Sequence, residues 1–316
     1  MISLSSKLPN VGVTIFAVMS KLANETGAVN LSQGFPDFDV DPELCNLVRK
    51  YMELGYNQYA PMQGVPALRR RIAEKTEELY GASYDPETEI TVASGATEAI
   101  FSAISCVVNR GDEVVLFEPA YDAYAPDVLL SGGIPVYVAL KYPDYHIDWN
   151  EVQDAITKKT KLLILNSPHN PTGTILGPED MAALMDIVAD TGIFIISDEV
   201  YEHIVFDGNR HESITGYPDL ARRSFVISSF GKTYSTTGWK MGYCLAPKQL
   251  SEEFQRVHQF VTYASNTPIQ WAYAEFMEKK EKYLALSNFY QERRDLFLSL
   301  IQDSRFKPLP CRGTYF

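Results

Sequence analysis

Two lysines stand eight positions apart in the stretch ISSFGKTYSTTGWKMGY, residues 227–243. Lys232 and Lys240 lie among serine, threonine and glycine residues, directly after an apolar run. A lysine amine can condense with an aldehyde, and a second lysine can neutralise a phosphate. A lone lysine, in contrast, is usually a solvated surface charge. The chemistry therefore depends on what else the fold brings to this stretch.

Four other polar motifs also follow apolar runs. SGATEA follows EITVA, EPAYDAY follows VVLF, NSPHNPTG follows LLIL, and DEVY follows IFIIS. Taken singly, each motif fits ordinary turn or cap chemistry. An open α/β sheet, however, binds its ligand outside the carboxyl ends of its strands. The five motifs are therefore expected to meet at one edge of a sheet.

The elements that would position these motifs alternate regularly along the chain. Apolar or β-branched runs (EITVAS, EVVLF, IPVYVAL, KLLIL, IFIIS and SFVISS) are mostly separated by helical patterns such as PEDMAALMDIVADTG. Runs such as LLIL do not alternate with polar residues, which is typical of strands covered on both faces. The sequence predicts an α/β fold with a mostly parallel sheet flanked by helices. Helix-rich segments at 13–26, 41–80 and 248–303 predict a second, smaller domain.

The composition of the chain limits the kinds of partner that it is expected to bind. The chain has 316 residues, 46% of them hydrophobic, and a formal net charge of -12. It lacks a Lys/Arg-rich block and an apolar run of about 18 residues, which argues against nucleic acid and membrane as partners. The four cysteines are too widely spaced for a zinc pair, so no metal site is predicted and a reducing, cytoplasmic location is expected.

The motifs together fit a cofactor with a phosphate, an aromatic ring with a basic nitrogen, and an aldehyde. Peptide N–H groups at the start of a helix would bind the phosphate, and these belong to Gly95, Ala96 and Thr97. Ser229 and Lys240 would add a hydroxyl group and a charge.

Three further residues would hold the ring and the aldehyde. Tyr121 could lie flat on the ring. Asp198, at the end of a buried strand, could pair with the protonated ring nitrogen. Lys232 would be the amine that condenses with the aldehyde.

These motifs resemble a known family. SxxK ending at Lys232, then GWKMGY, with DEVY at 198–201 and NPTG at 170–173, resemble class I pyridoxal-phosphate-dependent aminotransferases of the aspartate-aminotransferase-like fold. The resemblance runs from NLSQGFPDF to GTYF, almost the whole chain. LSQGFPDF, NQYAPMQGVPALR and GWK are most similar to the methionine and kynurenine aminotransferase branch. Lys240 stands where many class members have arginine, which supplies the charge without the bidentate fork.

The resemblance implies roles for individual residues. Lys232 would tether the cofactor and then move a proton as a base. Asp198 would keep the ring nitrogen protonated, and Tyr121 would stack on the ring. Tyr201 and Asn170 would hydrogen-bond the phenolate oxygen of the ring. Lys232, Asp198 and Tyr201 are thus the catalytic candidates.

Two implied roles concern the substrate and a second subunit. Gly34, with Asn170, would contact the amino acid or 2-oxo acid substrate. Tyr59 matches a tyrosine that reaches the phosphate of the neighbouring subunit, which implies a homodimer. Two alternatives remain open from the motifs, a carbon-sulfur β-lyase on the same scaffold and a non-catalytic fragment that binds pyridoxal phosphate.

The end of the sequence departs from the family pattern. Family members continue beyond GTYF and supply an arginine that binds the substrate carboxylate, whereas this sequence ends at Phe316. A C-terminally truncated chain is therefore expected. Residues 1–40 would be the N-terminal segment of the small domain, 41–280 the large cofactor-binding domain, and 281–316 the incomplete start of the C-terminal part of the small domain.

Overall fold

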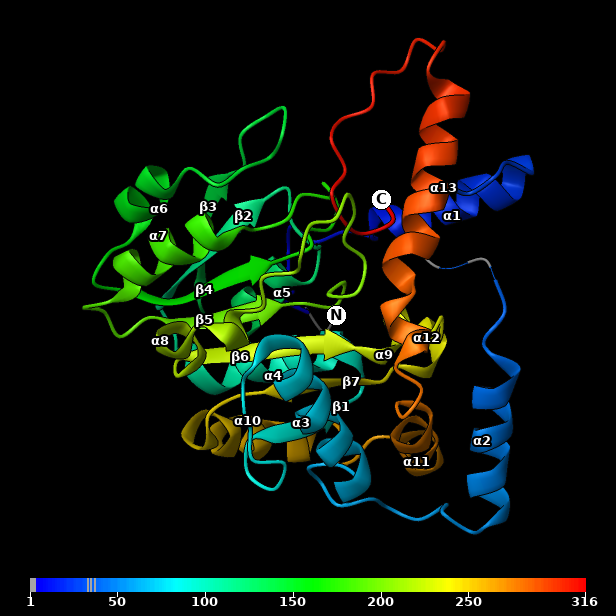
Figure 1. Ribbon diagram of the computed structural model, residues 1–316. Coiled ribbons are helices and arrows are strands. Elements are labelled where there is room, and N and C mark those ends of the chain that lie inside the picture. The colour runs from blue at the N-terminus through cyan, green and yellow to red at the C-terminus, as the bar shows by residue number, and fades with distance from the viewer. Residues whose placement is uncertain (1–3, 33, 35, 37) are drawn as a thin grey trace.

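A single mixed sheet forms the centre of the molecule (Figure 1). The computed structural model describes residues 4–32, 34, 36 and 38–316. Within these residues, seven strands lie in the order β1-β7-β6-β5-β4-β2-β3. The strands are β1 (Ile90–Ala93), β2 (Glu113–Glu118), β3 (Ile134–Ala139), β4 (Thr160–Asn166), β5 (Phe194–Asp198), β6 (Ser224–Ser229) and β7 (Gly242–Leu245).

The strand directions confirm the predicted mostly parallel sheet. β3, β2, β4, β5 and β6 pair in parallel, while β7 is antiparallel to both β1 and β6. All six apolar runs of the sequence form strands. β7 was not predicted, since GYCL is a short run directly after the GWKM turn. It lies between β1 and β6 and so joins the first strand of the sheet to the rest.

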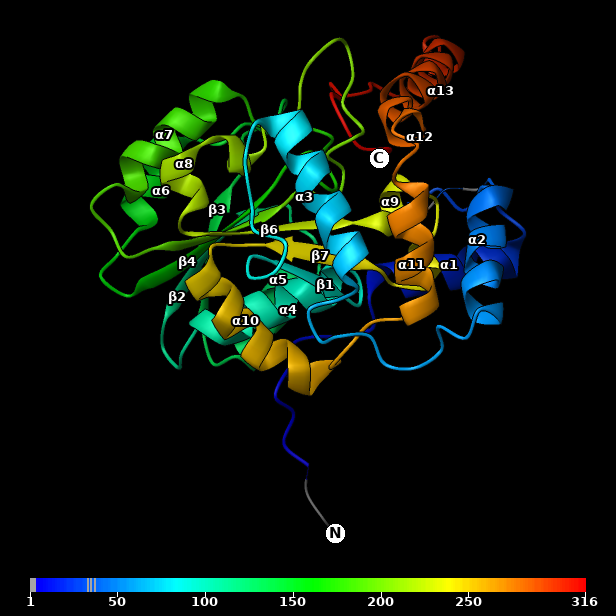
Figure 2. The ribbon, with the colours of Figure 1, turned by 60° about the horizontal axis from the view of Figure 1, so that its bottom comes forward.

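Both faces of the sheet are covered, as the unbroken apolar runs predict. On β2, Val115 and Phe117 enter the core beneath α3 and α7, while Val114 and Leu116 enter a second core beneath α4 and α10. Figure 2 shows α3, α7 and α8 on one side of the sheet and α4, α5 and α10 on the other. These helices are α3 (Pro66–Tyr80), α4 (Gly95–Val107), α5 (Tyr124–Leu130), α7 (Pro178–Val188), α8 (Pro218–Ala221) and α10 (Lys248–Val261); α6 (Trp149–Ala155) packs beside α7.

Further helices gather at one end of the molecule in both views (Figures 1 and 2). They are α1 (Ile15–Thr26), α2 (Pro42–Glu53), α11 (Thr267–Phe276), α12 (Glu281–Leu284) and α13 (Leu286–Ile301). α2 packs against α11 and buries Leu44 and Leu47. α13 leaves Leu296, Phe297 and Leu300 exposed. The division into residues 1–40, 41–280 and 281–316 stays a prediction.

None of the helices in the described part of the chain is both long enough and apolar enough to cross a bilayer.

Candidate active site

The strand-end motifs meet around one cavity of about 520 Å³. This volume is in the range of small-molecule and cofactor sites. All residues predicted to contact cofactor or substrate except Tyr59 line this cavity, namely Gly34, Gly95, Ala96, Thr97, Tyr121, Asn170, Asp198, Tyr201, Ser229, Lys232 and Lys240. The sheet edge therefore collects residues that are up to about two hundred positions apart in the chain.

The phosphate end of the cavity is built from the first turn of α4. Gly95 has a φ of 80°, a left-handed conformation that favours glycine, and it lets the chain turn from β1 directly into the helix. A Cβ atom at Gly242 of β7 would lie 2.8 Å from the nitrogen of Ala96, so only glycine allows β7 to run this close. Backbone N–H groups and the helix dipole at such a turn favour an anion.

Ser229 and Lys240 lie beside this helix start. Ser229 caps the short helix α9 (Phe230–Thr233) by accepting a 3.1 Å hydrogen bond from the N–H of Gly231. Lys240 has a φ of 53° and ends the 3-10 turn η2 (Thr237–Trp239). This turn directs its amine toward α4, since a Cβ atom built on Gly95 would be 3.5 Å from Lys240 Nζ. The N–H groups at the start of α4, the hydroxyl group of Ser229 and the amine of Lys240 are donors that suit a phosphate dianion.

Lys232 projects from α9 into the middle of the cavity. Its Nζ donates to the hydroxyl oxygen of Tyr315 at 3.1 Å and is 3.5 Å from the carbonyl oxygen of Gly34. Burial, with a smaller contribution from the Lys240 charge, lowers the pKa of the Lys232 amine to about 8, while Asp198 acts in the opposite direction. A larger fraction of this amine is therefore neutral and nucleophilic at neutral pH than for an ordinary lysine.

Asp198 ends β5 and is almost completely buried. Its Oδ2 accepts a 2.6 Å hydrogen bond from the hydroxyl group of Tyr124, and its Oδ1 accepts one of 3.3 Å from the N–H of Val200. Burial raises the pKa of this carboxyl to about 6, although both hydrogen bonds act to lower it. A cationic ring nitrogen beside it would favour the ionised form.

The aromatic and amide groups complete the walls. Tyr121 Oη lies 3.4 Å from Thr97 Oγ1, so this ring connects with the phosphate end. The centroid of the Tyr201 ring is 5.5 Å from Lys232 Nζ. The N–H of Asn170 donates to Asn166 Oδ1 at 2.8 Å.

Sequence reasoning assigned no role to several residues at this site. Tyr124 lies three positions after Tyr121 in EPAYDAY, and its contact with Asp198 is made only in the tertiary structure. Asn166 begins the NSPHNPTG motif; its amide donates to the carbonyl oxygen of Asp198 at 2.9 Å. Tyr315 and its neighbour Phe316 come from the terminal GTYF, and their approach to Gly34 is a tertiary contact that no local pattern announces.

Tyr59 lies elsewhere on the surface. Its side chain is 83% exposed, and its ring meets that of Tyr263 edge to face at 5.5 Å. The single chain does not bring it to its own cavity, so the role predicted for it in a neighbouring subunit stays a prediction.

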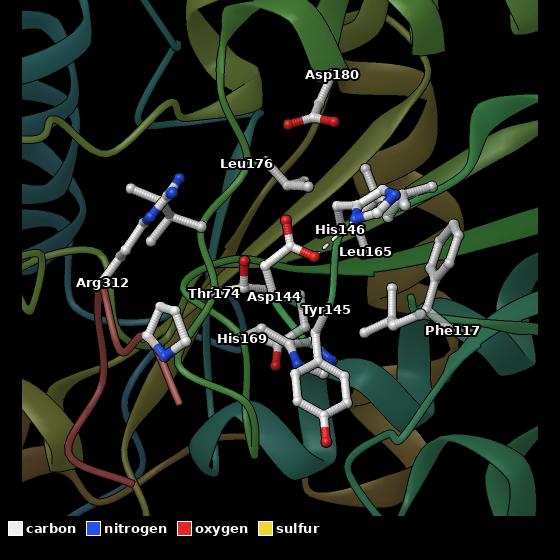
Figure 3. A pocket seen from close by; sticks show the side chains of 15 residues that line it. Phe117, Asp144, Tyr145, His146, Leu165, His169, Thr174, Leu176, Asp180 and Arg312 are labelled. Carbon is white, nitrogen blue, oxygen red and sulfur yellow. Dashed lines mark hydrogen bonds and ion pairs between the residues drawn. The ribbon is translucent and has the colours of Figure 1, made fainter. Parts of the chain in front are cut away.

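A second cavity of about 130 Å³ is shown in Figure 3, and Asn166 lines both this cavity and the first. Asp144 points toward His146 there, with 2.8 Å between Oδ1 and Nδ1. Arg312 also lines this cavity. Neither predicted lysine lines this smaller space, so the aldehyde and phosphate chemistry belongs to the larger one.

The larger cavity suits pyridoxal phosphate on the chemistry of its donors. A helix start with a nearby lysine suits the phosphate, and a buried amine suits the aldehyde. A buried carboxylate suits the ring nitrogen. Gly95 keeps the phosphate end clear, because a side chain there would extend toward Lys240.

Comparison with known proteins agrees with this geometry. The family model of class I and II aminotransferases matches residues 26–316. Methionine aminotransferase of Escherichia coli is 50% identical over 312 residues, which cover 98% of this chain and 81% of the relative. Human kynurenine--oxoglutarate transaminase 3 is 33% identical over 99% of this chain and 73% of its own length.

Solved structures show the same relationship. The crystal structure of an E. coli protein with a methionine aminotransferase function superimposes with a TM-score of 0.96 at 49% identity, covering 100% of this chain and 82% of that one. A mutant of Thermus thermophilus aspartate aminotransferase gives a TM-score of 0.91 at 29% identity, with 99% and 84% covered. The chain belongs to the class I and II aminotransferases, and it is an aminotransferase that depends on pyridoxal phosphate.

Proposed function

We propose that this aminotransferase takes the amino group from methionine, an aromatic amino acid or kynurenine and transfers it to a 2-oxo acid. The placement of Lys232 between Asp198, Tyr201 and the α4 helix start carries this proposal. The 50% identity to methionine aminotransferase and the similarity to kynurenine transaminases support the substrate class.

Lys232 has two tasks in this proposal. When bound, pyridoxal phosphate supplies an aldehyde that condenses with amines and a protonated ring that accepts the electron pair left at the substrate Cα. Lys232 would supply the amine that binds the cofactor aldehyde, and as a free amine it would be the base that takes the proton from the substrate Cα. The contact of Nζ with Tyr315 Oη keeps the free amine inside the cavity.

Asp198 and the residues around it would bind and orient the ring. The carboxylate of Asp198 would accept the ring N–H and so keep that nitrogen protonated. Tyr201 and Asn170 would donate to the phenolate oxygen, while Tyr121 would pack on the ring face. The N–H groups of α4, with Ser229 and Lys240, would bind the phosphate.

The substrate side of the cavity combines backbone polarity with apolar rings. A Cβ atom at Gly34 would lie within 3 Å of the rings of Tyr315 and Phe316, so glycine is required for their close approach. Phe16 and Phe316 also line the cavity. These rings favour a thioether or aromatic substrate side chain over a charged one.

A homodimer is part of the proposal, with Tyr59 of each chain serving the other chain's phosphate site. Its strong exposure and its distance from its own cavity support this role. Mixing inactive Lys232→Ala with impaired Tyr59→Ala chains tests it, because one site of each hybrid dimer would contain both native residues. Partial recovery of activity on mixing is expected, and no recovery would count against a shared site.

We also infer a reducing, cytoplasmic location. All four cysteines are free thiols, which supports this inference.

Single-turnover reactions of the loaded protein test the main proposal. Methionine, phenylalanine and kynurenine are each expected to give the matching 2-oxo acid, and the protein should then accept an amino group for transfer. Cystathionine serves as the control for β-elimination. Pyruvate release from cystathionine without oxo-acid formation from the other three would contradict the assignment and favour a carbon-sulfur β-lyase.

A further inference from the structure

The segment DEVYE, residues 198–202, presents two different faces. Asp198 and Tyr201 line the cavity, whereas Glu199 and Glu202 do not line it and are buried on the other side. The N–H of Glu202 donates to the carbonyl oxygen of Glu199 at 2.9 Å, so these residues form a tight turn. Two buried glutamates thus lie behind two residues of the site.

Strand alternation explains this separation. Ile195 of β5 and Val226 of β6 enter the core beneath α3, while Ile196 and Ile227 enter the core beneath α4. Because side chains alternate with a period of two, Ser228 falls on the α3 side and Ser229 on the α4 side with the phosphate site.

Glu202 is the centre of a hydrogen-bond cluster on the α3 side. Its Oε1 accepts from Lys75 Nζ and Ser228 Oγ, each at 2.6 Å, and from Tyr243 Oη at 3.1 Å. Its Oε2 accepts from the hydroxyl group of Tyr80 at 2.6 Å. The Lys75 and Glu202 side chains are 6% and 4% exposed. One carboxylate therefore joins α3, the turn after β5, and strands β6 and β7.

The ion pair is costly to bury. Burial opposes ionisation, but Lys75, nearby His203 and the hydrogen bond from Ser228 hold the pKa of Glu202 well below its usual range. Replacing such a pair by apolar residues is often neutral or stabilising, so its presence is weak evidence of a contribution to stability. The position of the pair indicates a role in positioning the site rather than in stability.

Each partner of Glu202 on the sheet is next to a residue that lines the phosphate end of the cavity or packs against the start of α4. Ser228 precedes Ser229, and Tyr243 follows Gly242. Ser229 and Gly242 are paired in the β6–β7 register. Glu202 itself follows Tyr201.

We propose that the Lys75–Glu202 pair is a positioning pair that fixes the Asp198–Tyr201 turn relative to the Ser229–Lys232 segment. It holds the groups that bind the ring at a set distance from those that bind the phosphate. Neither residue is among those that line the cavity. This inference rests on the proposed function, since it concerns the alignment of that same site.

The test uses the loaded enzyme with both charges removed, as Lys75→Met/Glu202→Gln. Lys75→Met alone leaves a buried carboxylate without its cation and is expected to unfold readily, which makes the double variant decisive. Its thermal midpoint should stay within a few degrees of the native protein. We expect kcat to fall about 10- to 100-fold with little change in KM, as for a small misalignment of reacting groups. The pH midpoint of the bound cofactor's visible absorbance should also shift, and affinity for the cofactor, measured by fluorescence quenching, should weaken.

The matched control is Glu78→Gln/Lys280→Met, an exposed pair that also begins on α3. It should leave kcat, cofactor affinity and the absorbance titration unchanged. A Lys75→Met/Glu202→Gln enzyme that behaves like this control would overturn the inference. The native enzyme separates the two claims, because failure of the native chain to bind pyridoxal phosphate would contradict the proposed function itself.

Discussion

The hydroxyl group of Tyr124 donates a 2.6 Å hydrogen bond to Oδ2 of Asp198, and both side chains are buried. Tyr124 opens α5 on one side of the sheet, while Asp198 ends β5. The bond fixes one carboxylate oxygen and leaves the other partly engaged with the N–H of Val200. Asp198 is thus held by groups that favour its charged form in surroundings that oppose the charge.

Removing this bond should change the pH profile of the enzyme. The pKa of Asp198 is raised by burial to about 6, and the Tyr124 bond lowers it. Tyr124→Phe removes this hydrogen bond, so the pKa of Asp198 should rise. The acidic limb of the pH profile of kcat/KM should therefore move upward by about one pH unit. Tyr137→Phe, at a half-exposed position on β3, is the control and should leave the limb in place. An unchanged profile in Tyr124→Phe would show that the bond does not tune the carboxylate.

Asp198→Asn should separate stability from activity. Because the folded-state pKa is raised, this carboxyl's contribution to stability is fully present below about pH 3.8 and is lost as pH rises through about 6. At pH 8 the cofactor-free Asn variant should therefore be more stable by up to about 3 kcal/mol in denaturant unfolding. Its half-reaction with methionine should nevertheless slow by several orders of magnitude, since the ring nitrogen loses its anionic partner.

Asp127→Asn is the matched control for that experiment. Burial raises the pKa of Asp127 to about 7, and its Oδ2 is buried without a hydrogen-bond partner. The same gain in stability at pH 8 is expected there, with activity retained, because Asp127 does not line the cavity. Loss of stability in both variants would contradict the assignment of burial as the cause of the raised pKa values.

The two lysines should differ in covalent chemistry. Lys232→Ala should lose the cofactor adduct that borohydride reduces onto the chain, whereas Lys240→Met should keep it with weaker phosphate binding. The Lys240 charge also helps to lower the Lys232 pKa, so adduct formation in Lys240→Met should require a higher pH. Peptide mapping of the reduced protein checks the assignment, and a label on any lysine other than Lys232 would refute it.

Gly95→Ala should weaken cofactor binding in addition to destabilising the backbone. Gly95 and Gly27 both have left-handed φ values, 80° and 65°, so alanine should cost about 1 kcal/mol of stability at either position. Only at Gly95 would the added methyl group lie near a lysine amine, since nothing lies within 4 Å of the corresponding atom at Gly27. Affinity for pyridoxal phosphate should fall about tenfold in Gly95→Ala alone. Equal affinities in the two variants would place the phosphate elsewhere.

Much of the fold was predictable because its signals are local. The runs that form β4 and β5 are apolar without alternation, since α3 and α7 cover one face and α4 the other. β7 was missed because its four residues owe their conformation to pairing with β1 and β6. A strand whose conformation depends on pairing with its neighbours has little recognisable pattern in its own sequence.

The residues of the site also divide into those that the local sequence identifies and those that only tertiary contacts define. Lys232, Asp198 and the α4 start are identifiable because a strand end or helix start dictates their surroundings. Tyr124 and Lys75 act through contacts that only the tertiary structure creates. Lys75 in particular lies in a charge-rich helix, where a solvated lysine is the ordinary expectation, and the distance of 127 positions between it and Glu202 hides their pairing.

The place of β7 also sets the order in which the protein can mature. Within the described residues, β1 joins the sheet only through β7, so residues 90–93 must wait for residues 242–245, about 150 positions later. Such distant pairing is slow, because a long loop has to close before the contacts form. During synthesis, the strand that leads into the start of α4 therefore has no strand to pair with until the ribosome has released β7. Capture of the cofactor is therefore a late step of biogenesis, and nascent chains that end before residue 242 should have no high-affinity site.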